Sequence, residues 1–228
     1  MLILAVDTTT PGGSVAVCHD ETLLGEANVE SAATHSARLF RSIDFLLGAL
    51  GRDIRDVEAF AVAAGPGSFT GIRIGIGAVK SLAFASGRPV AAVSTLLALA
   101  TKLAADGHGL VCPLLDAKKG EIYAGLFEAA AEGLAEVIPQ GAYVPDEFVA
   151  RLPAGRPIAF AGSGLAISRP ALAARLGEQA RFPARSPFIA AEVGRIGAGL
   201  LRAGRGVDAA SLEPLYFRKS QAEEPCRT

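Results

Sequence analysis

The stretch from residue 64 to 77, AGPGSFTGIRIGIG, constrains the fold more than any other part of the chain. The uncharged apolar run at 59–64 predicts a buried strand that leads into it. The Gly-Pro-Gly sequence that follows predicts a turn, because proline restricts φ and glycine adopts backbone angles that other residues resist. We expect a helix over 70–85 after this turn, with Ser68 or Thr70 as its N-cap.

The predicted helix carries small residues along one side, at Gly71, Gly75, Ala78 and Ala85. A glycine inside a helix costs about 1 kcal/mol relative to alanine, so the glycines need a physical reason. Close packing of the helix on its own sheet is one reason. A phosphate at the helix N-terminus and a second helix pressed against the bare backbone are the alternatives. The residues alone leave all three open.

The composition indicates a protein with a sizeable apolar core. The chain has 228 residues, of which 50% are hydrophobic, enough for one large domain or two small ones. A net charge of -1 and a pI of about 6.3 argue against nucleic-acid binding by the chain as a whole. No uncharged apolar run approaches the ~18 residues of a membrane helix. The predicted first strand leads directly to Asp7 and is not preceded by the basic region of a signal peptide, so we expect a strand here and not a signal peptide.

Three cysteines without close spacing indicate free thiols in a reducing cytosol. We therefore expect a cytoplasmic protein that makes no contact with a membrane.

Two short apolar runs, 2–6 and 110–116, each lead to an acid, Asp7 after the first and Asp116 at the end of the second. A polar turn and a second apolar run follow each acid, as in a β-hairpin. A repeat of this kind predicts two lobes built on the same plan, with a chance match as the alternative. The expected lobes are 1–106, which carries the partner-binding helices, and 107–228, which is smaller and ends in an extended tail.

Other elements follow from periodicity and from turn residues. The predicted strands are 14–18, 22–29, 89–93, 121–127 and 158–161. The predicted helices are 35–50, 95–105, 170–176 and 189–203. Residues 129–145 are predicted to form a loop-rich meander.

Two acid-tipped hairpins that face one cleft would suit a nucleotide. The backbone N–H groups of each turn can hold phosphate oxygens, and each aspartate can hold a metal ion or a water molecule beside them. The candidate nucleotide-binding residues are Asp7, Thr8, Thr9, Thr10, Gly65, Gly67, Ser68, Asp116, Lys118, Gly162 and Gly164. The alternative for both aspartates is turn formation, because Asp side chains bond to their own backbone in such turns. The sequence lacks a complete P-loop, dinucleotide-binding fingerprint or nucleophile elbow.

The histidines do not form the pattern of a metal site. His35 begins a predicted helix, where a second ligand would be needed three or four positions later. Arg38 and Leu39 occupy those positions. We therefore expect no bound metal ion at this helix.

Five blocks of sequence resemble one family in the same order. They are ILAVDTTT from residue 3, HSARL from 35, GPGSFTGIRIG from 65, VSTL from 93 and DAKKGEIY from 116. These blocks resemble the TsaB (YeaZ) family, subunits of the bacterial complex that makes threonylcarbamoyladenosine at position 37 of tRNAs that read ANN codons. The resemblance covers the whole chain and is sharpest over 2–123.

The resemblance implies an α/β protein with the actin-like ATPase fold of sugar kinases and the Hsp70 chaperones, in which two similar lobes carry mixed sheets flanked by helices. It also implies a larger catalytic partner, TsaD, and an ATPase, TsaE, that docks on the pair, with tRNA reached only through the complex. The family's pairing surface comes from two helices of the first lobe. The implied interface residues are His35, Arg38, Ser42, Phe45, Thr70, Gly71, Ile72, Ile74, Gly75, Ala78 and Leu82. On this interpretation the glycines allow a partner helix to come close.

The catalytic relative carries an H-x-x-x-H metal pair where this chain has His35 and Leu39. The resemblance therefore implies a non-catalytic subunit that activates its partner, and exposed apolar helices favour a homodimer of the free protein. An alternative function, suggested by Asp7 and Asp116, is a small ATPase or phosphotransferase that binds ATP or ADP with Mg²⁺ at low affinity. A glycoprotease is the least favoured function, because no complete nucleophile or metal site is found.

Overall fold

The computed structural model describes residues 1–10, 12–30, 35–130 and 133–217, with the backbone alone for 35–37. The chain divides into two compact units. The first comprises Met1–Lys102 and Ser186–Pro214, and the second comprises Leu103–Arg185 and Leu215–Thr228. This division differs from the expected lobes, 1–106 and 107–228, because a late segment of the chain returns to the first unit.

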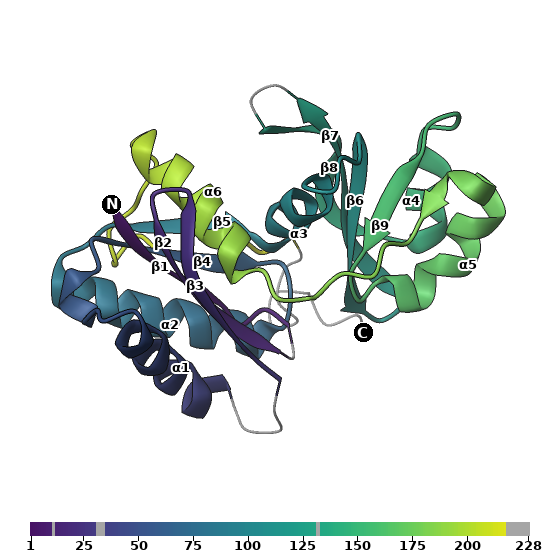
Figure 1. Cartoon of the computed structure of the whole chain (residues 1–228). Coiled ribbons are helices and arrows are strands. Elements are labelled where there is room, and N and C mark those ends of the chain that lie inside the picture. Colours follow the sequence, from purple (N-terminus) through teal and green to yellow (C-terminus); the bar gives the residue numbers. More distant parts are fainter. Residues whose placement is uncertain (11, 31–34, 131–132, 218–228) are drawn as a thin grey trace, which may run out of the picture. The chain divides into compact units, whose positions relative to one another are not determined.

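The first unit is built on a five-stranded mixed sheet with strand order β3-β2-β1-β4-β5 (Figure 1). The strands are β1 (Leu2–Asp7), β2 (Gly13–His19), β3 (Thr22–Val29), β4 (Ala59–Gly65) and β5 (Val90–Ser94). The accompanying helices are α1 (His35–Ala49), α2 (Phe69–Ser86), α3 (Thr95–Ala104) and α6 (Ala190–Arg202), with a short 3₁₀ turn, η1 (Ile54–Asp56). β1 pairs antiparallel with β2 and parallel with β4, so the predicted hairpin is confirmed.

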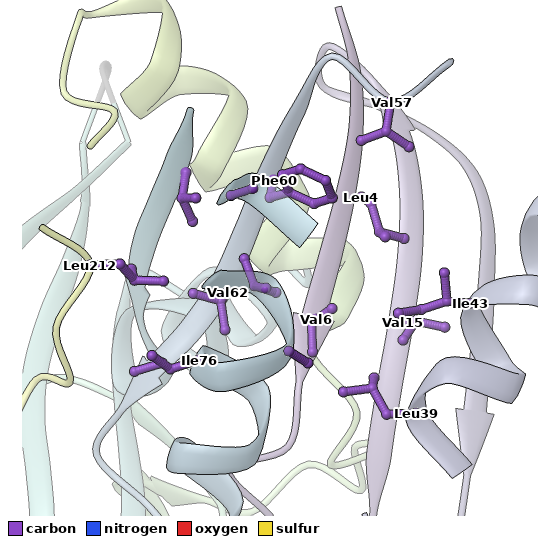
Figure 2. Packing of buried hydrophobic residues seen from close by; sticks show 14 of the residues in the cluster. Leu4, Val6, Val15, Leu39, Ile43, Val57, Phe60, Val62, Ile76 and Leu212 are labelled. Carbon is purple, nitrogen blue, oxygen red and sulfur yellow. The ribbon is translucent and has the colours of Figure 1, made fainter. Parts of the chain in front are cut away.

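One face of this sheet carries large side chains and packs against α1 and α2. Leu4 and Val6 of β1 and Val62 of β4 share a core cluster with Leu39 of α1 and Ile76 of α2, as Figure 2 shows. The alternation of side chains along a strand sends their neighbours to the opposite face. The helices 35–50 and 70–85 predicted from periodicity are therefore confirmed as helices whose apolar sides cover this face.

The opposite face packs against α6 (Figure 1), and the side chains that meet the glycines of α6 there are small, such as Ala5 and Ala61. A Cβ atom on Gly194 would lie 2.5 Å from Cys18 Sγ, and one on Gly197 would lie 2.6 Å from Ala61 Cβ. Helix and sheet therefore touch almost backbone to backbone. This packing is the reason that the segment Ser186–Pro214 belongs to the first unit.

The segment after α6 also packs on the first unit. Val207 pairs with Val90 beside β5, and the Lys80 ammonium group on α2 donates to the carbonyl oxygens of Ala210 (3.1 Å) and Leu212 (3.3 Å). The side chain of Leu212 is buried in the core cluster. The segment thereby fastens the C-terminal half of α2 to the sheet.

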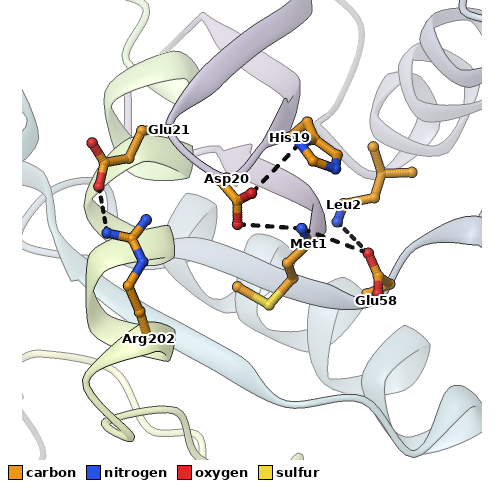
Figure 3. A network of polar contacts seen from close by, with 7 residues as sticks. All are labelled: Met1, Leu2, His19, Asp20, Glu21, Glu58 and Arg202. Atoms are coloured by element: carbon orange, nitrogen blue, oxygen red, sulfur yellow. Dashed lines mark hydrogen bonds and ion pairs between the residues drawn. The ribbon is translucent and has the colours of Figure 1, made fainter.

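Polar contacts surround the start of β1 (Figure 3). The Met1 amino group donates to Asp20 Oδ1 over 3.2 Å, and the Leu2 N–H group donates to Glu58 Oε2 over 2.6 Å. These contacts tie β1 to the β2–β3 turn and to the segment before β4. They lie at the opposite end of β1 from Asp7.

The second unit repeats the plan of the first. Its sheet has the order β8-β7-β6-β9-β10. In both units, the strands lie across the sheet in the order third, second, first, fourth and fifth, counted along the chain of that unit. The elements are β6 (Leu110–Lys118), β7 (Glu121–Ala130), β8 (Gly133–Tyr143), α4 (Pro145–Arg151), β9 (Ile158–Ala161), α5 (Leu165–Leu176), η2 (Gly177–Gln179) and β10 (Ala180–Arg181). The predicted repeat of an acid-tipped hairpin is confirmed by this topology.

Two predictions for this part of the chain are wrong. The predicted meander at 129–145 contains the long strand β8, an edge strand with little buried surface, so its apolar pattern is weak. The helix predicted at 170–176 begins at Leu165, because Pro170 lies inside α5 instead of starting it.

Candidate functional site

The end of β1 and the turn after it are ordered by the side chain of Asp7. Its Oδ1 atom accepts hydrogen bonds from the Thr9 N–H group (2.8 Å) and from Thr9 Oγ1 (2.6 Å). The Thr10 hydroxyl donates to the Gly12 carbonyl oxygen. These are the bonds of a turn-forming aspartate, the alternative role recognised in the sequence.

The Asp7 carboxyl group is completely buried, and its Oδ2 atom has no hydrogen-bond partner among the described residues. Burial raises the pKa of Asp7 from 3.8 to about 6, although its hydrogen bonds with Thr9 and the charge of Lys102 act in the opposite direction. A charged group without full solvation or pairing is costly to bury. The carboxylate therefore destabilises the folded state at neutral pH.

Lys102 is the cation that faces this buried region. Its ammonium group lies 3.6 Å from Glu192 Oε2 of α6 and donates to the carbonyl oxygen of Phe188. The side chains of Lys102 and Glu192 are mostly buried. The pair links α3 to the first turn of α6.

The turn after Asp7 is hydrogen-bonded to the N-terminal end of α2. The Thr8 hydroxyl donates to the Gly71 carbonyl oxygen over 2.7 Å, and the Ser68 N–H group donates to the Thr9 carbonyl oxygen over 2.8 Å. Of the two N-cap residues that the sequence predicted, Ser68 and Thr70, the N-cap is Ser68, since its side chain accepts a bond from Gly71 N. The first turn of α2 is thus hydrogen-bonded to the end of β1.

Contacts within the chain explain why two positions of α2 are glycine. A Cβ atom on Gly71 would overlap the Thr8 carbonyl oxygen, and one on Gly75 would overlap the Thr8 hydroxyl. Both residues are buried. Gly71 and Gly75 therefore face Thr8 of the same chain, which supports close packing within the first unit as the reason for these two glycines.

In the second unit, Asp116 also forms its own turn. Its Oδ1 atom accepts a bond from Lys118 N (2.7 Å), and its Oδ2 atom lies 2.8 Å from Lys118 Nζ. These bonds with Lys118 lower the pKa of Asp116. Gly162 and Gly164 pack against the backbone of Leu114, where a Cβ atom on Gly162 would overlap the Leu114 carbonyl oxygen.

The structure distributes the candidate nucleotide-binding residues between two groups. Asp7, Thr8 and Thr9 lie together with Gly67 and Ser68 in the first unit. Asp116, Lys118, Gly162 and Gly164 lie in the second. Several donors that would hold a phosphate are bonded within the protein, among them the Thr8 hydroxyl, the Thr9 N–H group and the Lys118 N–H group.

The residues that the resemblance assigned to an interface fall into three sets. Arg38, Gly71, Ile72, Gly75 and Ala78 are buried within the chain itself. Ser42, Phe45, Thr70, Ile74 and Leu82 are exposed or partly exposed. The side chain of His35 lies outside the described residues.

The outer sides of α1 and α2 carry further exposed residues that the sequence reasoning missed. Phe84 is 82% exposed, compared with 71% for Phe45. Gly48 and Gly77 would have nothing within 4 Å of an added Cβ atom. The spacing of residues 70, 73, 77, 81 and 84, three or four apart, was the signal for this stripe.

Within the described ranges, no cluster of three or more His, Cys, Asp or Glu side chains is placed to bind a metal ion. Among the same residues, no helix has the length and apolar character needed to cross a bilayer.

Comparison with known proteins shows where the chain belongs. Residues 28–194 match the family model described as TsaD, tRNA N6-adenosine threonylcarbamoyltransferase. The chain is 34% identical to the tRNA threonylcarbamoyladenosine biosynthesis protein TsaB of Bacillus subtilis, over 71% of each chain. It is 36% identical to the protein of the same name from Escherichia coli, over 59% of this chain and 58% of that one.

Solved structures agree with this relationship. YeaZ from Pseudomonas aeruginosa superposes with a TM-score of 0.79 and 29% identity, over 94% of this chain and 99% of that one. The activator of the 2-hydroxyisocaproyl-CoA dehydratase from Clostridium difficile shares the fold alone, with a TM-score of 0.51 and 9% identity over 95% and 100% of the chains. Two mixed sheets flanked by helices and repeated in order are the actin-like ATPase fold. The chain therefore belongs to the TsaB (YeaZ) family of tRNA threonylcarbamoyladenosine biosynthesis proteins.

Proposed function

We propose that this protein is a non-catalytic subunit in the formation of threonylcarbamoyladenosine at position 37 of tRNA, and that it pairs with a TsaD-type transferase through the outer sides of α1 and α2. The observation that carries the proposal is the pair of exposed helix sides, which we call the docking face. It comprises Phe45, Gly48, Thr70, Arg73, Gly77, Ser81 and Phe84.

The docking face combines two features that packing within the chain does not explain. Phe45 and Phe84 expose most of their surface to solvent, which favours burial against another protein. Gly48 and Gly77 each weaken a helix by about 1 kcal/mol, yet neither lies against another part of the chain. A helix of a partner can approach closely at bare glycines, so both features suit a helical partner.

A TsaD-type subunit is the partner that the family relationship favours. The family model for TsaD matches 28–194 of this chain, so the two proteins are expected to share a fold and to present corresponding helices. We also propose that a TsaE-type ATPase docks on the pair, and that tRNA is contacted through the complex. A homodimer of the free protein would use the same face.

The non-catalytic role is supported by the position that would hold the second metal ligand. Leu39 occupies it, and its side chain is buried in the core cluster with Leu46 and Val15. The alternative function, an ATPase or phosphotransferase, is less well supported, because the donors at Thr8 and Thr9 are bonded inside the protein. A glycoprotease has no observation in its favour.

The test is to mix the purified protein with the TsaD-type subunit of the same organism and to measure the dissociation constant by calorimetry. Phe84→Glu and Gly77→Leu are expected to weaken pairing at least tenfold, because they place a charge or a bulky side chain on the docking face. Val137→Glu in β8 is the matched control, since Val137 is also exposed but lies in the second unit, and it should pair like the wild type.

Pairing that is equally strong in all three variants would contradict the docking face. A wild-type protein that forms only homodimers would contradict the choice of partner. Loss of the modified adenosine in a deletion strain, restored by the wild type and not by Phe84→Glu, would connect pairing with the modification.

A further inference from the structure

The two most distinctive stretches of the sequence, 7–10 and 65–71, meet in one contact within the first unit. Thr8 Oγ1 and the Gly71 carbonyl oxygen are 2.7 Å apart, and Ser68 N and the Thr9 carbonyl oxygen are 2.8 Å apart. The contact joins the end of β1 to the first turn of α2. The resemblance of these stretches to nucleotide-binding turns does not give this contact a function, and neither does the family relationship.

The contact allows almost no adjustment. Gly71 and Gly75 present bare backbone to Thr8, and neither could carry a side chain without overlapping it. Asp7 in turn orders the loop by accepting two bonds from Thr9. The position of the first turns of α2 relative to the end of β1 therefore depends on the backbone of residues 8 and 9 and on one hydroxyl group.

The opposite side of the same helix carries part of the docking face. Thr70, Arg73 and Gly77 are exposed, while Gly71 and Gly75 are buried. Because a helix moves as a rigid unit over a few turns, a shift at its buried side displaces its exposed side by a similar amount. An interface that relies on close approach at bare glycines tolerates such a shift poorly.

We infer that Thr8 is a positioning residue for α2, and that the Asp7–Thr9 turn holds α2 in the position that pairing requires. This inference rests on the proposed function. Replacing the hydroxyl of Thr8 by a methyl group would substitute a van der Waals contact for a hydrogen bond. Since a carbon–oxygen contact is longer than 2.7 Å, the substitution would push α2 away from the turn.

The test compares Thr8→Val, Thr8→Ser and Thr101→Val. Thr101 is the matched control, because its hydroxyl also donates to a helix carbonyl oxygen, that of Leu97, in the first unit (2.9 Å). Amide hydrogen exchange of residues 71–77 is measured on each free protein, and the dissociation constant with the TsaD-type subunit is measured by calorimetry. Urea unfolding records the overall stability of each variant.

Thr8→Val is expected to raise exchange at 71–77 and to weaken pairing at least fivefold. Thr8→Ser, which keeps the hydroxyl, and Thr101→Val are expected to stay within twofold of the wild type in both measurements. Should Thr8→Val fail to fold, Thr8→Ala removes the same bond without adding bulk and takes its place in the comparison.

Exchange and pairing in Thr8→Val that match those of Thr101→Val would overturn the inference. A wild-type protein that does not pair at all would contradict the proposed function instead. The exchange measurement is made without the partner, so the two failures are distinguishable.

Discussion

The substitution Asp7→Asn is expected to stabilise the protein at neutral pH and to lose that advantage in acid. Asparagine keeps an oxygen atom that can accept both bonds from Thr9, and it removes the buried charge. Aspartate carries its charge in a fully buried position, with Oδ2 unbonded among the described residues. The neutral side chain should therefore be the better one for stability wherever the wild-type carboxyl group is ionised.

The magnitude follows from the pKa. Burial raises the pKa of Asp7 from 3.8 to about 6, and each pKa unit corresponds to about 1.4 kcal/mol. A carboxyl group whose folded-state pKa is raised contributes stability that is present below its unfolded pKa and is lost as the pH rises through the folded pKa. From well below pH 3.8 to well above pH 6, the wild type should therefore lose about 3 kcal/mol that Asp7→Asn does not lose, and about 2 kcal/mol of this loss falls between pH 4 and pH 7.5.

The assay is urea unfolding of both proteins at pH 4.0, 5.0, 6.0 and 7.5, followed by circular dichroism because the chain contains no tryptophan. Only the change of the difference with pH is interpreted, so any constant cost of the asparagine amide cancels. Asp116→Asn is the control. The bonds from Lys118 lower the pKa of Asp116, so its difference from the wild type should stay flat over this range.

A difference between Asp7→Asn and the wild type that does not change from pH 4 to 7.5 would refute the reasoning. It would mean that Asp7 ionises as it does in the unfolded chain. The Asp7 carboxylate would then not be buried in solution with its Oδ2 atom lacking a hydrogen bond.

Two further substitutions test the packing around this region. Lys102→Met is expected to lower the free energy of unfolding by up to about 3 kcal/mol in urea titrations, because it removes the nearer cation of the buried Glu192 carboxylate and leaves Arg195 at 4.0 Å; adding Glu192→Gln should recover part of the loss, and no recovery would contradict the pairing. Gly71→Ala is expected to destabilise by about 3 kcal/mol, because the new methyl group overlaps the Thr8 carbonyl oxygen. Gly77→Ala on the exposed side of the same helix is expected to stabilise by about 1 kcal/mol, and thermal unfolding that shifts both variants in the same direction would contradict this assignment.

Local patterns predicted most of the secondary structure. The strand Ile158–Ala161 and the boundaries of α2 within a residue or so follow from apolar runs, glycine and the Ser68 cap. Such signals are local, because propensity, capping and periodicity act within a few residues of one another. The edge strand β8 was missed for the same reason: its neighbours in the sheet, rather than its own composition, make it a strand.

The candidate site shows the limit of such patterns. Asp7 and the glycines of α2 were recognised as unusual, but the sequence alone left alternatives open: a nucleotide site or turn formation for Asp7, and sheet packing, a phosphate or a partner helix for the glycines. A glycine within a helix indicates that another group approaches the backbone closely, but it does not identify that group. The three-dimensional structure shows that the Thr8 backbone and hydroxyl occupy that space.

The hairpin repeat, the buried strands and helices, and the family could be predicted from the sequence, because each depends on residues near one another in the chain or on motifs in order. The three-dimensional structure was needed to show that α6 returns to the first sheet, that Gly71 and Gly75 face inward, and that Gly77 and Phe84 face outward. Burial and close contact depend on which segments meet in space. Segments as distant as residues 8 and 71 carry no local signal of that meeting.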